Sequence, residues 1–268
     1  MESESNESRS VYFDLQAGWG ITKHIGGGAA TRELASLCSI DCSSRVLVIG
    51  CGNGFSACTL ARDLGCRLVG IDISPAMVER STQRAQKMGL TETVSFREAD
   101  ATRLPFDTGQ FDVVFSESVN AFVPEPATAL REYLRVLAEG GRVGINECVW
   151  LVPPPSSLER YMERTMDARF LNADGGWDTL LREAGFEAPT TSIRKMSPVQ
   201  QWKSELDQID AGEMVRAWLS LPWTVLTDAT TRRWVLSTLA APPGALRLFH
   251  YFGYGLFTAT KPAGRSSL

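Results

Sequence analysis

The sequence of 268 residues has only two histidines and no surplus of basic charge, because 27 Lys and Arg residues stand against 31 Asp and Glu residues, a net charge of −4. A dedicated nucleic-acid-binding protein would carry a basic stripe, so that class is disfavoured. The longest apolar runs have the length of a strand and not of a membrane-spanning helix. Residues 1–10 are polar and acidic and lack the apolar core of a signal peptide, so we expect a cytoplasmic protein that binds no membrane.

The six cysteines form no Cys-x-x-Cys pair. A disulfide framework is disfavoured in a cytoplasmic chain of this length, and no spacing indicates a bound metal. The plain interpretation is that these cysteines are small buried hydrophobic residues. The alternative is a thiol or metalloid site that uses Cys51 and Cys148.

Strand-sized apolar runs and helical patterns alternate from residue 30 to residue 147. The run Val46–Ile49 is wholly aliphatic, as in a strand buried on both faces of a sheet. Further strands are predicted at Arg67–Asp72, Val94–Arg97, Phe111–Ser116 and Arg142–Glu147. Because strands that alternate with helices are joined by crossovers, we expect a parallel sheet.

A glycine-rich turn follows the first predicted strand. Gly50, Gly52 and Gly54 form the pattern Gly-x-Gly-x-Gly before a helix. Ligands of an open α/β sheet bind beyond the carboxyl ends of its strands, and glycines there let the backbone approach a ligand. The next strand ends in Asp72, which can accept hydrogen bonds from both hydroxyls of a ribose. A dinucleotide site would need a glycine at the position of Phe55, so a nicotinamide dehydrogenase is disfavoured.

With these motifs the sequence resembles the class I S-adenosylmethionine-dependent methyltransferases of the small-molecule type, over about residues 30–149. Arg135–Gly141 also resembles a turn of that family, with Ala138-Glu139 in place of Lys-Pro. The resemblance implies S-adenosyl-L-methionine as the cofactor and S-adenosyl-L-homocysteine as the product. It implies that the cofactor is bound by Tyr12, Gly50, Cys51, Gly52, Gly54, Asp72, Ile73, Asp100, Ala101 and Ser116.

We therefore predict an α/β fold with a doubly wound, mostly parallel Rossmann-like sheet, an antiparallel last strand and an added helical lobe. Four segments are expected: an N-terminal tail and cofactor-covering segment at 1–29, the cofactor-binding core at 30–150, a helical substrate or lid lobe at 151–250 with a sixth strand near 188–195, and a final strand at 251–262 that returns to the core sheet.

Candidate catalytic residues lie where the predicted strands end. Glu117 and Glu147 could hold a cationic amine or act as a base, and the alternative is that one of them only orders loops or contacts the cofactor. His24 is the better placed of the two histidines to act as a base, although a lone histidine is more often structural. The residues predicted to contact the substrate are Trp19, Asn120, Trp150 and Tyr254.

The predicted function is methyl transfer to an N, O or C atom of a small-molecule acceptor. Two alternatives stay open: methylation of a thiol or metalloid, and a non-catalytic regulatory subunit that binds S-adenosylmethionine. A small molecule is the expected partner, nucleic acid is not expected, and a homodimer is the protein assembly considered.

Overall fold

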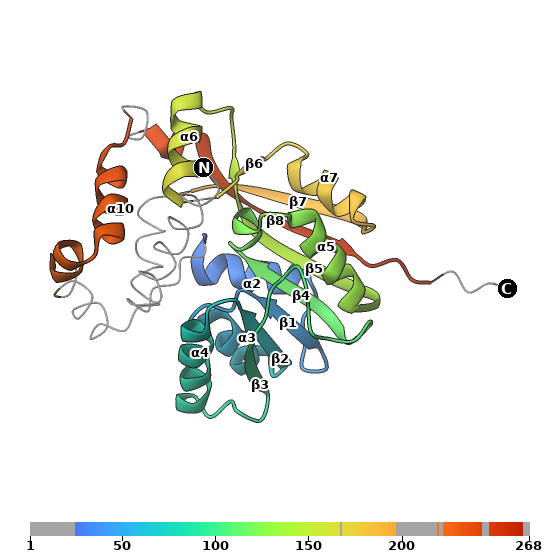
Figure 1. The fold of residues 1–268 in the computed structure, drawn as a ribbon. Helices are drawn as coiled ribbons and strands as arrows, with labels where there is room; N and C mark the ends of the chain where they lie inside the picture. Colours follow the sequence, from blue (N-terminus) through green and yellow to red (C-terminus); the bar gives the residue numbers. More distant parts are fainter. Residues whose placement is uncertain (1–24, 167, 197–218, 220–221, 243–246, 265–268) are drawn as a thin grey trace.

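The computed structural model describes residues 25–166, 168–196, 219, 222–242 and 247–264 (Figure 1). An eight-stranded sheet runs through the molecule in the order β3-β2-β1-β4-β5-β8-β7, and β6 pairs with β5. The strands are β1 (Arg45–Ile49), β2 (Arg67–Asp72), β3 (Val94–Glu98), β4 (Phe111–Glu117), β5 (Leu137–Trp150), β6 (Leu171–Asn172), β7 (Glu187–Lys195) and β8 (Phe252–Thr260). The first five pair in parallel, and β8 is antiparallel to both β5 and β7. The predicted fold class is thus confirmed.

Helices cover both faces of the sheet (Figure 1). Their bounds are α2 (Gly27–Leu37), α3 (Phe55–Leu64), α4 (Pro75–Lys87), the 3-10 helix η1 (Asn120–Phe122), α5 (Pro126–Val136), α6 (Ser156–Met166), α7 (Gly176–Glu183), α10 (Ala229–Leu239) and α11 (Leu248–Tyr251). Along β1, Val46 and Val48 pack in the core under α2 and α3, whereas Leu47 and Ile49 pack in the core under α5 and α7. This alternation follows from the two-residue period of a strand.

The second half of the chain differs in part from the expected layout. β7 covers the segment where a sixth strand was expected, but it is the seventh strand because the two-residue β6 precedes it. α7 lies within the range expected to form a lobe, yet its Trp177 and Leu181 are buried in the core beside Phe257 of β8. β7 therefore extends the core sheet, and α7 belongs to the helices that pack on it.

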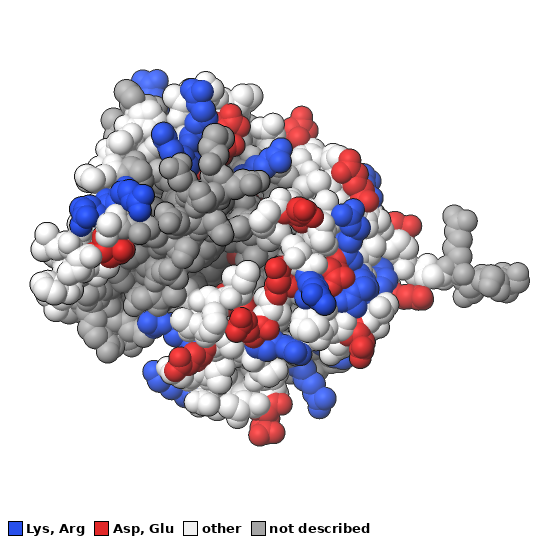
Figure 2. Space-filling view, in the orientation of Figure 1, with Lys and Arg blue, Asp and Glu red and all other residues white. Residues whose placement is uncertain are grey.

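Charged side chains of both signs are interspersed over the described surface of the face shown in Figure 2. Among the helices of the described ranges, none is long and apolar enough to cross a membrane.

Candidate active site

The glycine loop between β1 and α3 has a backbone that requires glycine at three positions. Gly50, Gly52 and Gly54 have φ angles of 61°, 54° and 78°, which lie in the left-handed region that other residues rarely adopt. The loop is also tightly enclosed. A Cβ atom on Gly50 would lie 2.3 Å from Cγ2 of Val119, and one on Gly54 would lie 2.8 Å from Cβ of Ser81.

Asp72, the last residue of β2, holds the glycine loop through its carboxylate. One oxygen accepts the N–H of Gly52 at 2.9 Å and the other accepts the N–H of Ser74 at 2.9 Å. Burial raises the pKa of this carboxyl group, and the N–H donors oppose that effect. Next to it, the side chain of Ile73 is 69% exposed, so an apolar surface stands open beside a polar acceptor.

The segment after β3 lies against the end of β2, because the N–H of Ala99 donates to the carbonyl of Asp72 at 3.0 Å. Asp100 forms a turn there. Its Oδ1 accepts the backbone N–H and the hydroxyl of Thr102, both at 2.7 Å. Asp72, Ile73, Asp100 and Ala101, which were predicted together, are thus carried by two adjacent segments at one edge of the sheet.

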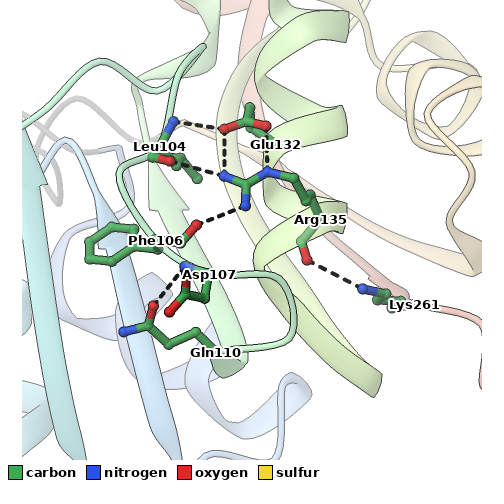
Figure 3. Close-up of polar contacts among 7 residues, drawn as sticks. All are labelled: Leu104, Phe106, Asp107, Gln110, Glu132, Arg135 and Lys261. Atoms are coloured by element: carbon green, nitrogen blue, oxygen red, sulfur yellow. Dashed lines mark hydrogen bonds and ion pairs between the residues drawn. The ribbon is translucent and has the colours of Figure 1, made fainter.

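Arg135 of α5 holds the loop that follows Asp100 (Figure 3). Its guanidinium donates to the carbonyls of Phe106 at 2.7 Å and Leu104 at 2.9 Å, and it forms an ion pair with Glu132 at 2.7 Å. Glu132 in turn accepts the N–H of Leu104 at 2.7 Å. This planar arrangement of donors explains why an arginine stands in the Arg135–Gly141 motif.

Glu117 ends β4 and contacts the helix that precedes β1. The buried hydroxyl of Thr31 in α2 donates to Oε1 of Glu117 at 2.9 Å. The start of α2 is fixed to the same edge by its backbone, since the N–H of Ile25 donates to Oγ of Ser118 at 3.3 Å and its carbonyl accepts Nδ2 of Asn146 at 2.7 Å. β4, β5 and α2 therefore meet around Glu117.

Glu147 is completely buried near the end of β5. Its Oε1 accepts the N–H of Val119 at 2.9 Å, the N–H of Asn120 at 2.6 Å and Nδ2 of Asn120 at 3.2 Å. Burial raises its pKa from 4.5 to about 7, against the effect of these donors. The remaining oxygen, Oε2, has no partner in the described structure.

Asn120 was predicted to contact the substrate, but both polar atoms of its side chain are engaged within the protein. Nδ2 donates to Oγ of Ser116 at 2.8 Å as well as to Glu147, and Oδ1 accepts the hydroxyl of Tyr133 at 2.8 Å. Ser116, predicted to contact the cofactor, is buried in the same network. Tyr133 and Val119 were missed by the sequence reading.

Two further predicted substrate contacts lie in packed surroundings. Trp150 is buried edge-on against Phe170 and Phe252. The ring of Tyr254 lies over Gly26, where an added Cβ would come within 2.8 Å of it. The predicted residues Tyr12, Trp19 and His24 lie outside the described residues.

Cys51 and Cys148, which the thiol or metalloid alternative would use, are both buried. Burial raises the pKa of both Cys51 and Cys148, so each is protonated at neutral pH and a poor nucleophile or metal ligand. Within the described residues, no cluster of His, Cys, Asp and Glu could hold a metal ion. These surroundings do not favour the alternative.

Comparison with known proteins agrees with this geometry. The family described as methyltransferase domain matches residues 47–145, which run from β1 into β5. Residues 47–145 are therefore similar to a methyltransferase domain. The glycine loop and Asp72 lie within this match, whereas α2 and all residues after 145, Glu147 included, lie outside it.

The relatives of this methyltransferase domain match only part of the chain. The 27-O-demethylrifamycin SV methyltransferase of Amycolatopsis mediterranei is 35% identical over 162 residues, which cover 59% of this chain and 59% of that protein. The chain therefore matches less than two thirds of that relative's length.

Solved structures share the fold over nearly the whole chain. The crystal structure of the [4+2]-cyclase SpnF has a TM-score of 0.72 and 24% identity, with 96% of this chain and 94% of that chain covered. Phosphoethanolamine N-methyltransferase 2 of Haemonchus contortus, solved with S-adenosyl-L-methionine, has a TM-score of 0.67 and 18% identity and covers 95% of this chain and 57% of that chain. At these identities the likeness concerns the fold.

The residues of the methyltransferase domain fit S-adenosylmethionine. The left-handed glycines leave three positions of the turn without a side chain, Asp72 offers carboxylate oxygens that can accept further hydrogen bonds, and Ile73 offers an exposed apolar surface. The amino-acid part of the ligand can lie along the glycine turn, the ribose can bind to the carboxylate, and the adenine can pack on the apolar surface.

Proposed function

We propose that this chain is a methyltransferase that uses S-adenosylmethionine to methylate an N, O or C atom of a small molecule. The observation that carries the proposal is the glycine loop with its three positive φ angles, tied to Asp72 by the hydrogen bond from Gly52. The match of residues 47–145 to the methyltransferase domain supports it.

Each part of the site has a role in this proposal. Asp72 would accept hydrogen bonds from the ribose hydroxyls, and Ile73 would cover one face of the adenine. Asp100 would accept the adenine amine, and the backbone of Ala101 would meet a ring nitrogen. When bound, the cofactor supplies a sulfonium methyl group that is already a strong electrophile, so the protein's main task is to align the acceptor and exclude water.

Glu117 is the side chain in the described structure best placed to serve the acceptor. It is half-buried at the carboxyl end of β4, and the Thr31 hydroxyl fixes its carboxylate without enclosing it. A carboxylate held in this way can bind a cationic amine or take a proton from a hydroxyl or amine in reach. His24 stays a proposed second base.

The fold by itself does not decide the reaction, since the same fold occurs in a [4+2]-cyclase. A regulatory subunit would also bind the cofactor without turnover.

We propose the cytoplasm as the location, a small molecule as the partner and no role for nucleic acid. A homodimer is proposed only as the assembly to test first, by light scattering of the purified chain.

Calorimetry of the purified chain tests the proposal directly. S-adenosylmethionine should bind with micromolar affinity and NADH should not. Asp72→Asn replaces one acceptor oxygen by a donor and should weaken binding at least about tenfold. Asp112→Asn is the matched control, because Asp112 lies near the start of β4 at the opposite edge of the sheet and pairs with Arg45 at 2.8 Å.

The outcomes separate the alternatives. Binding of NADH in place of S-adenosylmethionine would favour a dehydrogenase, and binding of neither would contradict the proposal. Where the cofactor binds, a screen of amines, phenols and carbon acids for formation of S-adenosylhomocysteine distinguishes an enzyme from a regulatory subunit. Formation of S-adenosylhomocysteine without a methylated acceptor would not count as methyl transfer.

A further inference from the structure

Glu147 connects β5 to η1, two elements that are distant in sequence. It lies in β5, and its Oε1 accepts two consecutive backbone N–H groups, from Val119 and Asn120, at the start of η1. One carboxylate oxygen therefore serves as the N-terminal cap of the segment that follows β4. Such a cap orients the backbone of that segment relative to β5.

The cap is held from behind by a second layer of hydrogen bonds. Asn120 donates to both Glu147 and Ser116, and it accepts the hydroxyl of Tyr133, whose side chain is completely buried in α5. Ser116 of β4, Glu147 of β5 and Tyr133 of α5 all belong to this network. The position of the Glu147 carboxylate is therefore fixed by the core of the fold.

Val119 transmits this position to the glycine loop. A Cβ atom on Gly50 would lie 2.3 Å from Cγ2 and 3.2 Å from Cγ1 of Val119. The Val119 side chain thus occupies the space that a side chain on Gly50 would need. Since the N–H of Val119 is bound by Glu147, the carboxylate, the valine and the first glycine of the loop form one continuous line of contacts.

Packing alone is a poor reason to have a carboxyl group at this place. Burial of a carboxyl group costs free energy, and Oε2 of Glu147 has no partner to offset that cost. An apolar side chain would avoid the cost but could not accept the N–H groups of Val119 and Asn120. Departures of this kind from local rules are expected where function requires them.

We infer that Glu147 is a positioning residue for the cofactor: its carboxylate fixes Val119 against Gly50 and so sets the shape of the glycine loop. The inference rests on the proposed function and deepens it. It assigns Glu147 a place in cofactor binding and gives it no contact with the acceptor and no proton to take from it.

Calorimetry with S-adenosylhomocysteine as the probe tests the inference, because this ligand needs no knowledge of the acceptor. Glu147→Gln keeps a carbonyl oxygen that can accept both N–H groups and should bind within about threefold of the wild type. Glu147→Leu leaves them without an acceptor and should lose at least about tenfold in affinity.

Leu181→Ala is the matched control for lost stability. Leu181 is completely buried in α7, which packs against α5, β6, β7 and β8. It should lower the melting temperature at least as much as Glu147→Leu and leave the affinity unchanged. A role of Glu147 in stability alone would make the two variants behave alike.

Hydrogen exchange of the same proteins gives a second readout. Glu147→Leu should speed exchange in peptides covering 116–123 and 50–54 and leave those from β7 as in the wild type. Should Glu147→Leu fail to fold, Val119→Ala takes its place, since it removes the contact with Gly50 and keeps every hydrogen bond of Glu147. It should weaken binding about fivefold.

Each remaining outcome overturns something specific. Unchanged affinity in Glu147→Leu, or in Val119→Ala as its substitute, overturns the inference and leaves the proposed function in place. An equal loss in Glu147→Gln and Glu147→Leu also overturns it, because charge and not the hydrogen-bond acceptor would then be responsible. Failure of the wild type to bind S-adenosylhomocysteine overturns the proposed function, and the inference with it.

Discussion

The hydroxyl of Thr31 donates to the carboxylate of Glu117 at 2.9 Å, and this bond joins α2 to the carboxyl end of β4. The two residues are 86 positions apart in the sequence. α2 lies outside the matched methyltransferase domain, so the bond attaches an added helix to the edge of the sheet where the ligand is proposed to bind.

A double-mutant cycle of Thr31→Val and Glu117→Ala should give a coupling free energy of about 1–2 kcal/mol, because the hydrogen bond has a charged acceptor and a buried donor. Urea unfolding of the four proteins measures it. The matched control is the exposed ion pair between Glu33 of the same helix and Arg194, at 2.6 Å, whose coupling should stay below about 1 kcal/mol. Equal couplings in the two cycles would show that α2 is not specifically fixed at Glu117.

The glycine loop gives a second prediction. Gly50→Ala should lower the free energy of unfolding by about 3 kcal/mol, because it adds a side chain to a left-handed residue and places it against Val119. Gly89→Ala separates these two causes, since Gly89 has a φ of 67° but nothing within 4 Å of an added Cβ. It should cost only about 1 kcal/mol.

The affinity for the cofactor product should also differ between these two glycine variants. Gly50→Ala should abolish binding of S-adenosylhomocysteine in calorimetry, whereas Gly89→Ala should bind like the wild type. Normal binding by Gly50→Ala would remove this loop from the cofactor site.

The local parts of this structure could be predicted from the sequence. The strand Val46–Ile49 and its glycine turn are encoded within nine residues, where aliphatic composition and backbone freedom leave few alternatives. The alternation of strands with helices then indicates a parallel sheet, because such strands are joined by crossovers. The antiparallel last strand was expected only from the resemblance to the methyltransferase family.

The side-chain network at the end of β4 could not be predicted, because tertiary contacts decide it. The pattern of α5 shows only that Tyr133 lies near an apolar face, and nothing local shows that its hydroxyl reaches Asn120. Glu147 was predicted to end a strand, but β5 continues to Trp150. The carboxylate of Glu147 accepts backbone N–H groups of a different element. The position of a residue along a strand determines at which edge of the sheet its side chain lies. Its hydrogen-bond partner is determined only by tertiary packing.

Arg135 gives a prediction about the loop that carries Asp100. Arg135→Lys should lower the free energy of unfolding by about 1–3 kcal/mol, because an ammonium group cannot reach Glu132 and the carbonyls of Leu104 and Phe106 together. Arg62→Lys is the control, since Arg62 is exposed and pairs only with its neighbour Asp63 in the described structure, and it should change stability by less than about 0.5 kcal/mol. Equal effects in chemical unfolding would mean that the guanidinium network does not hold this loop.

The last prediction concerns pH and Glu147. The native state raises the pKa of this carboxyl group from 4.5 to about 7 by burial, so between these values the folded chain binds a proton that the unfolded chain has lost. The contribution of Glu147 to stability is therefore fully present below pH 4.5, decreases as the pH rises, and is lost above about pH 7. Its size is about 3 kcal/mol. Glu147→Gln cannot titrate, so its stability relative to the wild type should rise by about that amount between roughly pH 5 and pH 8.

Urea unfolding of both proteins across this range measures the difference. Asp112→Asn serves as the control, because Arg45 holds the pKa of Asp112 below its usual value. That carboxyl group is ionised in both states throughout the range, so the control should differ from the wild type by a constant amount. A constant difference for Glu147→Gln as well would show that Glu147 is ionised at every pH tested, and that the donors from Val119 and Asn120 outweigh the cost of burial.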